Sequence, residues 1–371
     1  MTIQIRNAMD DFVTRDFLNL PARVYRNDPN YCPRFLDSEK RELYRPEFTG
    51  KSIAFVGYRN AVPECRVLAR ISPALKDETD LPMGILGMYE AFDSPEATLE
   101  MLLQALEWYR CNGVRTIIGP MNGDTWHSYR FSCGPWDAPV FLMEPYNPPY
   151  YLNHWLSVGF QTYQEYYSKT VEDLESLVER TARFAEKSAS RGYTVRHLKM
   201  KNFYCELRTL YNLSVKIFNE NLLFTPIDYP EFEGLYTGSR ALIDPECVLF
   251  ALDRTGTPAG FLFGFPDEFS AVRSMRGHKH LIARFRFLRR KGRARIMNAK
   301  SLGILPDHRG AGLAGMLMHQ LYRVALNRGF NRVNLCLFHE SNPSGSLEAG
   351  LGAISRKYKL LKKTLETTIR E

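Results

Sequence analysis

The segment from Arg295 to Gly329 constrains the fold of this chain more than any other. RIMNAKSLGILP predicts a strand, DHRGAG a glycine-rich turn, and LAGMLMHQLYRVALNRG a helix, because its apolar residues recur at helical spacing. NRVNLCLF then alternates apolar and polar residues, which predicts a further strand. This order of elements indicates an α/β fold. A helix that starts after glycines directs backbone N–H groups outward, so the turn predicts a phosphate site.

The turn matches the patterns of two different ligands. Gly310, Gly312 and Gly315 form the G-x-G-x-x-G of dinucleotide-binding loops, and Glu340 stands roughly where such folds place a ribose-binding acid. Against NAD, four residues separate the strand from the first glycine, and the remaining chain is short for a doubly wound sheet. The Walker pattern of nucleoside triphosphate sites is absent. Arg309, at the head of the turn, instead adds a cation that suits a pyrophosphate.

The first half of the chain follows the same plan. LPMGILGMYEAF predicts a strand, SPEATLEMLLQALEWYRCNG a helix with Ser94 as its N-cap, and VRTIIGP the next strand. Each half then closes on a short helix and a strand, in PPYYLNHWLSVGF with QTYQEYYSKTV and in PSGSLEAGLGA with ISRKYKLLKK. We therefore predict two copies of one α/β domain, residues 1–168 and 169–371. The turn EAFDSPEA has no glycine and carries three acids, so the first copy should not bind phosphate.

Composition limits the cellular setting. The N-terminus, MTIQIRNAMDDFVTRDF, has neither the basic region nor the apolar core of a signal peptide, and no apolar run is long enough for a membrane span. The seven cysteines are odd in number and form no C-x-x-C pair, which suits reduced thiols. These features predict a cytoplasmic protein.

The net charge of +8 is concentrated in one stretch. Ten basic residues lie between Arg273 and Arg295, and no acid occurs from Phe269 to Pro306. An anionic ligand or surface is expected near this stretch, with a solvated basic helix or loop as the alternative. Phe285 and Phe287 alternate with arginines, so one face of the stretch could be buried.

SLGILPDHRGAGLAGMLMHQL resembles the acyl-CoA-binding segment of the GNAT acyltransferase superfamily, whose signature is Q or R, two residues, G, one residue, and G or A. NLCLFHESNPSGSLEAGLGA is similar to the next strand and helix of that superfamily. The resemblance covers residues 169–371, and GPMNGDTWHSYRF and MEPYNPPYY extend it to a group of two-domain GNAT-like proteins. It implies an α/β fold of two tandem GNAT-like domains, each a mixed twisted sheet flanked by helices, the first one degenerate.

The resemblance also implies which residues bind CoA. They are Leu302, Gly303, Ile304, Arg309, Gly310, Ala311, Gly312, Leu313, Ala314, Asn342 and Ser344. The first three would pair with the pantetheine amides, the turn would hold the pyrophosphate, and Asn342 and Ser344 would lie near the thiol.

The catalytic groups are less evident. Many GNAT enzymes have a tyrosine general acid after the Asn, but Glu348 and Ala349 occupy that region here. The candidate acid is Tyr358, and the candidate base is Glu340 at the end of a central strand. Two loops of the first half, rich in proline and aromatic residues, supply candidate acceptor-binding residues, which are Asn122, Trp126 and Tyr146. No metal site is expected.

These features together predict an N-acyltransferase with acetyl-CoA or another acyl-CoA as co-substrate and a small amine or amino-acid-like acceptor. The missing tyrosine leaves open a CoA-binding protein without catalysis. The basic stretch leaves open a Fem-like transferase that uses aminoacyl-tRNA, although nucleic acid is not the favoured partner. The acceptor, the acyl chain length and the oligomeric state stay open.

Overall fold

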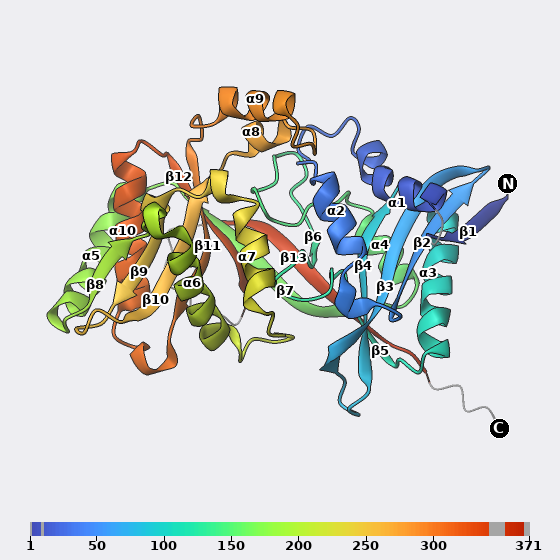
Figure 1. Cartoon of the computed structure of the whole chain (residues 1–371), viewed down its shortest axis with the longest axis horizontal. Helices are drawn as coiled ribbons and strands as arrows, with labels where there is room; N and C mark the ends of the chain where they lie inside the picture. The colour runs from blue at the N-terminus through green and yellow to red at the C-terminus, as the bar shows by residue number, and fades with distance from the viewer. Residues whose placement is uncertain (1, 9–10, 341–352, 367–371) are drawn as a thin grey trace. The chain divides into compact units, whose positions relative to one another are not determined.

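The computed structural model describes residues 2–8, 11–340 and 353–366, which form two compact units (Figure 1). Unit 1 comprises Met1–Glu165, Ala271–Arg289 and Lys357–Glu371, and unit 2 comprises Tyr166–Ser270 and Arg290–Arg356. The domains predicted from the sequence were contiguous, whereas here 271–289 and 357–371 group with the first unit. The division into two functional domains stays a prediction.

Unit 1 is a mixed sheet in the order β1-β2-β3-β4-β5-β13, with β6 paired to β13. Neighbouring strands are antiparallel except β4 and β5, which are parallel. The strands are β1 Ile3–Asn7, β2 Ser52–Arg59, β3 Val62–Lys76, β4 Pro82–Ala91, β5 Thr116–Gly119, β6 Phe131–Ser132 and β13 Ala353–Thr364. The helices that flank the sheet are α1 Asp11–Val24, α2 Leu36–Leu43, α3 Pro95–Cys111 and α4 Tyr151–Ser157.

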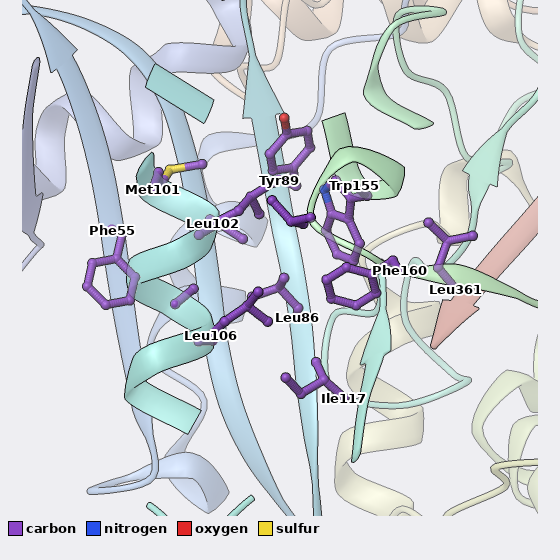
Figure 2. Close-up of a cluster of buried hydrophobic side chains, with 14 of the residues drawn as sticks. Phe55, Leu86, Tyr89, Met101, Leu102, Leu106, Ile117, Trp155, Phe160 and Leu361 are labelled. Carbon is purple, nitrogen blue, oxygen red and sulfur yellow. The ribbon is translucent and has the colours of Figure 1, made fainter. Parts of the chain in front are cut away.

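Helices cover both faces of this sheet because its strands are apolar on both sides. Phe55 of β2 packs in the core beneath α3, whereas its neighbours Ala54 and Val56 pack in a second core with α1. Figure 2 shows the first of these cores between α3, the sheet and the region of α4. Its labelled members are Phe55, Leu86, Tyr89, Met101, Leu102, Leu106, Ile117, Trp155, Phe160 and Leu361.

Unit 2 has a second mixed sheet in the order β7-β12-β11-β10-β9-β8. Here β11 and β12 are parallel and the other pairs are antiparallel. The strands are β7 Gln161–Val171, β8 Thr194–His197, β9 Val248–Leu252, β10 Pro258–Pro266, β11 Ile296–Ile304 and β12 Arg332–His339. The helices are α5 Leu174–Ser190, α6 Phe203–Phe218, α7 Tyr229–Thr237 and α10 Leu313–Asn327.

The helices of unit 2 also lie on both faces of their sheet. Leu262 of β10 belongs to the core formed with α5 and α10, while its neighbour Phe261 faces the other way and contacts Phe218 of α6 at a centroid distance of 6.1 Å. This mixed α/β architecture confirms the predicted fold class. One local expectation differs. Ser94 precedes α3, but its hydroxyl donates to Glu64 at 2.5 Å and does not cap the helix.

The segment that returns to unit 1 carries two short helices, α8 Phe269–Arg273 and α9 Leu281–Arg290. Its place is fixed by backbone contacts. The Arg273 guanidinium donates to the carbonyl of Tyr31 at 3.2 Å, and the Leu36 amide donates to the carbonyl of Gly277 at 3.2 Å. Throughout the described ranges, no helix is both long and apolar enough to cross a bilayer.

Candidate functional site

In unit 2, the parallel strands β11 and β12 part midway along their length. They pair from Ile296 with Arg332 to Ala299 with Leu335, and the pairing stops there. β11 continues to Ile304 while still paired with β10. On the side toward β12, the part of β11 from Ser301 to Ile304 therefore has no strand partner within the described residues. An extended ligand with amide groups could pair with such an edge.

A bulge in β12 accounts for this separation. The register between β12 and β7 shifts between Leu335 and Phe338. Leu337 has a φ of +60°, and its amide donates at 3.1 Å to the side-chain hydroxyl of Ser168 on the neighbouring strand β7. A bulge bends its strand and ends regular pairing. The strand predicted from NRVNLCLF is present as part of β12, and the bulge lies within it.

The turn after β11 depends on two glycines in the left-handed region. The chain forms a short 3-10 helix over Pro306–His308 and begins α10 at Leu313. Gly310 and Gly312 have φ values of +77° and +91°. Residues with a Cβ rarely adopt this conformation, so the path of the turn requires glycine at both positions.

The hydrogen bonds that hold this turn in place do not use its backbone N–H groups. The carbonyl of Ala311 accepts a hydrogen bond from the Ser188 hydroxyl at 3.0 Å, and the Met316 amide donates to the carbonyl of Gly312 at 3.0 Å. Among the residues described, none of the amides from Gly310 to Gly315 donates a hydrogen bond. N–H groups left free at the positive end of a helix bind anions. This geometry suits a phosphate group.

The three glycines of the turn have different roles. A Cβ on Gly310 would meet nothing within 4 Å, so the space beside it is open to a ligand. A Cβ on Gly312 would lie 3.0 Å from the Ser188 hydroxyl. A Cβ on Gly315 would lie 2.5 Å from Cγ of Phe184, because α10 packs closely on α5 there. The third glycine of the G-x-G-x-x-G match therefore serves helix packing.

This packing role gives a testable prediction. Gly315→Ala should lower the free energy of unfolding by about 1–3 kcal/mol through overpacking against Phe184, despite the higher helix propensity of alanine. The control is Gly234→Ala in α7, where a Cβ would meet nothing within 4 Å. That variant should be more stable than the parent by up to about 1 kcal/mol. Urea unfolding of both variants checks the two signs, and equal signs would contradict the packing role.

The structure places the other candidate residues of unit 2 as follows. Arg309 is exposed, with Nε 3.4 Å from the carbonyl of Ile304 and a guanidinium nitrogen 3.9 Å from the exposed Glu220 carboxylate. Glu340 is exposed directly after β12. Asn342 and Ser344 lie outside the described residues. The unpaired edge is the carboxyl end of β11, the turn follows it, and Glu340 follows the carboxyl end of β12. Ligands bind at the carboxyl ends of parallel strands in open sheets.

Tyr358 stands in the part of β13 that belongs to unit 1. Its side chain is completely buried, and its hydroxyl donates to the Glu144 carboxylate. These contacts suit a role in the core of unit 1, and the role of Tyr358 as general acid stays a prediction.

The candidate acceptor-binding residues brace loops of unit 1. Asn122 accepts a hydrogen bond from the Met88 amide at 2.8 Å, and the Tyr146 hydroxyl donates to Asp28 at 2.7 Å. The Trp126 amide donates to the Asp124 carboxylate at 2.8 Å. The first two bonds explain why an asparagine and a tyrosine occur at positions 122 and 146. A role in binding an acceptor stays a prediction for all three residues.

The same loop contains a titratable cluster, and the sequence did not indicate that Arg45 takes part in it. Asp124 lies 2.8 Å from Nδ1 of His127 and 2.8 Å from the guanidinium of Arg45. Burial lowers the pKa of His127, but the carboxylates of Asp124 and Glu42 outweigh it and raise that pKa above its usual value. Burial raises the pKa of Asp124, but His127 and Arg45 outweigh it and hold that pKa below its usual value. The arginine comes from a distant part of the chain, so no local motif marks the cluster.

Comparisons with known proteins agree with this geometry. Residues 207–346 match the acetyltransferase (GNAT) family. The bacterial ceramide synthase of Caulobacter vibrioides (strain NA1000 / CB15N) is 24% identical over 343 residues, which are 88% of each chain. A tandem GNAT protein from the clavulanic acid biosynthesis pathway superposes with a TM-score of 0.53 at 12% identity, over 98% of each chain.

A further likeness is to the glucosamine N-acetyltransferase region of a fungal multi-domain GH3 β-N-acetylglucosaminidase. It has a TM-score of 0.53 and 13% identity over 97% of this chain, which spans only 38% of that larger protein. At such identities the solved structures establish the fold. The family match spans the turn and the parted strands, and the tandem GNAT structure shares the fold of the whole chain.

Proposed function

We propose that this protein transfers an acyl group from an acyl-CoA to an amine. The observation that supports it is the juxtaposition, in unit 2, of an unpaired strand edge and a turn whose amides make no hydrogen bonds in the described residues. An acyl-CoA presents matching groups, which are the amides of an extended pantetheine arm and a doubly charged pyrophosphate. A nicotinamide dinucleotide has the pyrophosphate but no amide-bearing arm, so it explains only the turn.

The residues that would hold the acyl-CoA follow from this match. Leu302, Gly303 and Ile304 lie on the unpaired part of β11 and would pair with the pantetheine amides. The amides from Gly310 to Ala314 would bind the pyrophosphate, with the exposed Arg309 as an additional cation. The parting of the strands would then leave the thioester near the end of β12.

Acyl transfer at that place needs simple proton chemistry. The amine nitrogen attacks the thioester carbonyl, a C–N bond forms as the C–S bond breaks, the amine loses a proton and the thiolate gains one. Glu340 is the proposed base, because it is an exposed carboxylate directly after β12. Asn342 and Ser344 remain proposed contacts of the thiol.

The acceptor is proposed at the level of a class. A small amine or amino-acid-like molecule suits the general family chemistry. The relative named bacterial ceramide synthase supports a second class, because a ceramide is the N-acyl derivative of a long-chain amino alcohol. Both classes present the same reacting group, a primary amine, and differ in the apolar chain that accompanies it.

An acyl-CoA turnover screen tests the proposal. The protein is incubated with acetyl-CoA or palmitoyl-CoA and with amino acids, polyamines or sphinganine, and both free thiol and N-acyl product are measured. At least one pair should give both products in equal amounts, and Glu340→Gln should lower kcat without weakening CoA binding. Saturable CoA binding without turnover of any pair would leave a CoA-binding protein. Turnover of aminoacyl-tRNA alone would favour the Fem-like alternative.

A further inference from the structure

The helix α9 exposes an apolar stripe. Leu281, Ile282, Phe285 and Leu288 are 82%, 61%, 59% and 68% exposed. Their spacing places them together along one side of the helix. Leu281 and Leu288 are the two most exposed large hydrophobic side chains in the part of the chain that the structure describes. Contiguous apolar side chains left in water mark an interaction surface.

The opposite side of α9 is firmly packed. Ala283 and Phe287 are 0% and 7% exposed. The Ala283 amide is 3.3 Å from Nδ1 of His280, and the Lys279 ammonium lies 4.7 Å from the centroid of the Phe35 ring. Both contacts are within unit 1. The helix therefore has a separate buried face, and the exposed stripe is available to bind a partner.

The charges around the stripe are of one sign. Arg284, Arg286 and Arg289 lie on α9, and the basic run continues to Arg295. None of the basic side chains from Arg284 to Arg293 forms an ion pair with a carboxylate among the described residues. No acid occurs from Phe269 to Pro306. Any partner of this helix should therefore be both anionic and apolar.

We infer that α9 docks this protein on the surface of an anionic lipid bilayer. Such a surface offers headgroup phosphates to the arginines and acyl chains to the leucine, isoleucine and phenylalanine side chains. RNA phosphates would pair with the arginines, but RNA offers no apolar surface to three exposed aliphatic side chains. A second copy would bring an equally basic helix against this one, with no acid to offset the repulsion. An anionic lipid surface accounts for both the apolar stripe and the positive charge beside it.

The inference stands apart from the proposed acyl transfer, because it rests on α9 alone and requires no reaction. It bears on that proposal in one respect. Long-chain amines and long-chain acyl-CoAs both partition into bilayers, so a protein held at the interface would meet them there. A protein that acylates only small amines could still bind lipid through this helix.

Vesicle flotation tests the inference directly. The full-length protein is mixed with vesicles of phosphatidylcholine, alone or with phosphatidylglycerol, at low and high salt. Binding should require the anionic lipid and weaken with salt. The triple variant Leu281→Ser, Phe285→Ser, Leu288→Ser should lower the partition coefficient at least about tenfold, because three apolar side chains leave the interface. Since these side chains are exposed, far-UV circular dichroism and urea unfolding should stay unchanged.

Matched variants separate this surface from the rest of the molecule. Leu99 and Leu103 on α3 are 41% and 47% exposed, and replacing both with serine should leave vesicle binding at the parent level. Replacing Arg284, Arg286 and Arg289 with glutamine should remove the preference for anionic lipid. Failure of the parent to float with anionic vesicles would overturn the inference. Two other results without vesicle binding would also overturn it. One is binding of tRNA that the arginine variant loses and the serine variant keeps. The other is a dimer of the parent that dissociates in the serine variant.

Discussion

Replacing Gly310 with glutamate is expected to weaken CoA binding more than about 100-fold. The new carboxylate would lie beside amides that are free to bind the pyrophosphate, at the positive end of α10. Two unit charges of like sign about 5 Å apart repel by about 3 kcal/mol at an effective dielectric constant of about 20. That energy alone corresponds to more than a hundredfold loss of affinity. Isothermal titration of CoA measures it.

Gly310 is the better position for this test than Gly312. A Cβ at Gly310 meets nothing within 4 Å, whereas a Cβ at Gly312 presses on the Ser188 hydroxyl that holds the turn. The matched control is Gly329→Glu at the other end of α10, where the glycine has a similar φ of +70°. It introduces the same charge and the same backbone strain about 20 Å away. Equal CoA affinity in the two variants would contradict the assignment of the turn.

The elements around the turn could be predicted because their signals are local. The apolar spacing of α10, the glycine at φ +70° that follows it and the run of β11 are all contained in contiguous sequence. The opening between β11 and β12 could not be predicted in this way. It depends on Leu337 turning toward Ser168, a contact 169 residues apart in the chain. Local alternation predicts a strand but does not show where its partner leaves it.

Glycine spacing also carried less information than the motif suggests. A missing Cβ is required both where a ligand approaches and where two helices touch, and the sequence does not distinguish the two cases. The contact between Gly315 and Phe184 belongs to the second case. The same limit applies to the basic stretch. Alternation suggested one buried face, but its helical geometry buries Phe287 and exposes Phe285.

Buried charges in unit 1 could not be predicted from the sequence for a related reason. Arg66 on β3 is 0% exposed, and its partners come from α1, α2 and β4. Its guanidinium donates to the carbonyl of Phe17 at 2.7 Å and to Glu39 at 2.7 Å, and lies 3.9 Å from Glu90. No spacing rule links residues so far apart. Two buried carboxylates therefore lie beside Arg66, and Arg34 lies 3.5 Å from one of them, Glu39.

The pKa shifts of the two acids show what Arg66 does. Burial raises the pKa of Glu39, but the guanidinium groups of Arg66 and Arg34 together outweigh it, and the pKa lies below its usual value. Burial raises the pKa of Glu90 more than Arg66 and Arg34 lower it, so it stays above its usual value. Glu39 therefore stabilises the fold at neutral pH and loses that contribution as the pH falls through its lowered pKa. Glu90 contributes in the opposite direction.

Arg66→Met is expected to destabilise the protein by about 3–5 kcal/mol at pH 7, because both acids stay buried and lose the cation that acts on them most strongly. The loss should shrink toward pH 5. Without Arg66, Arg34 is the remaining cation that opposes the effect of burial, so the pKa of Glu39 should rise and that of Glu90 should rise further. The penalty of each charged acid is then present above its folded pKa and disappears as the pH falls toward the unfolded value near 4.3. Guanidinium unfolding at the two pH values measures the difference.

Two further variants separate charge from packing. Adding Glu39→Gln to Arg66→Met should recover part of the loss at pH 7, because one buried carboxylate is gone. Arg59→Met on β2 is the matched control, since Arg59 pairs with Glu64 and Glu96 near the surface and its loss should change stability little. A loss that is equal at both pH values would instead attribute the effect of Arg66 to its packing on the Phe17 ring, 4.6 Å from the guanidinium carbon.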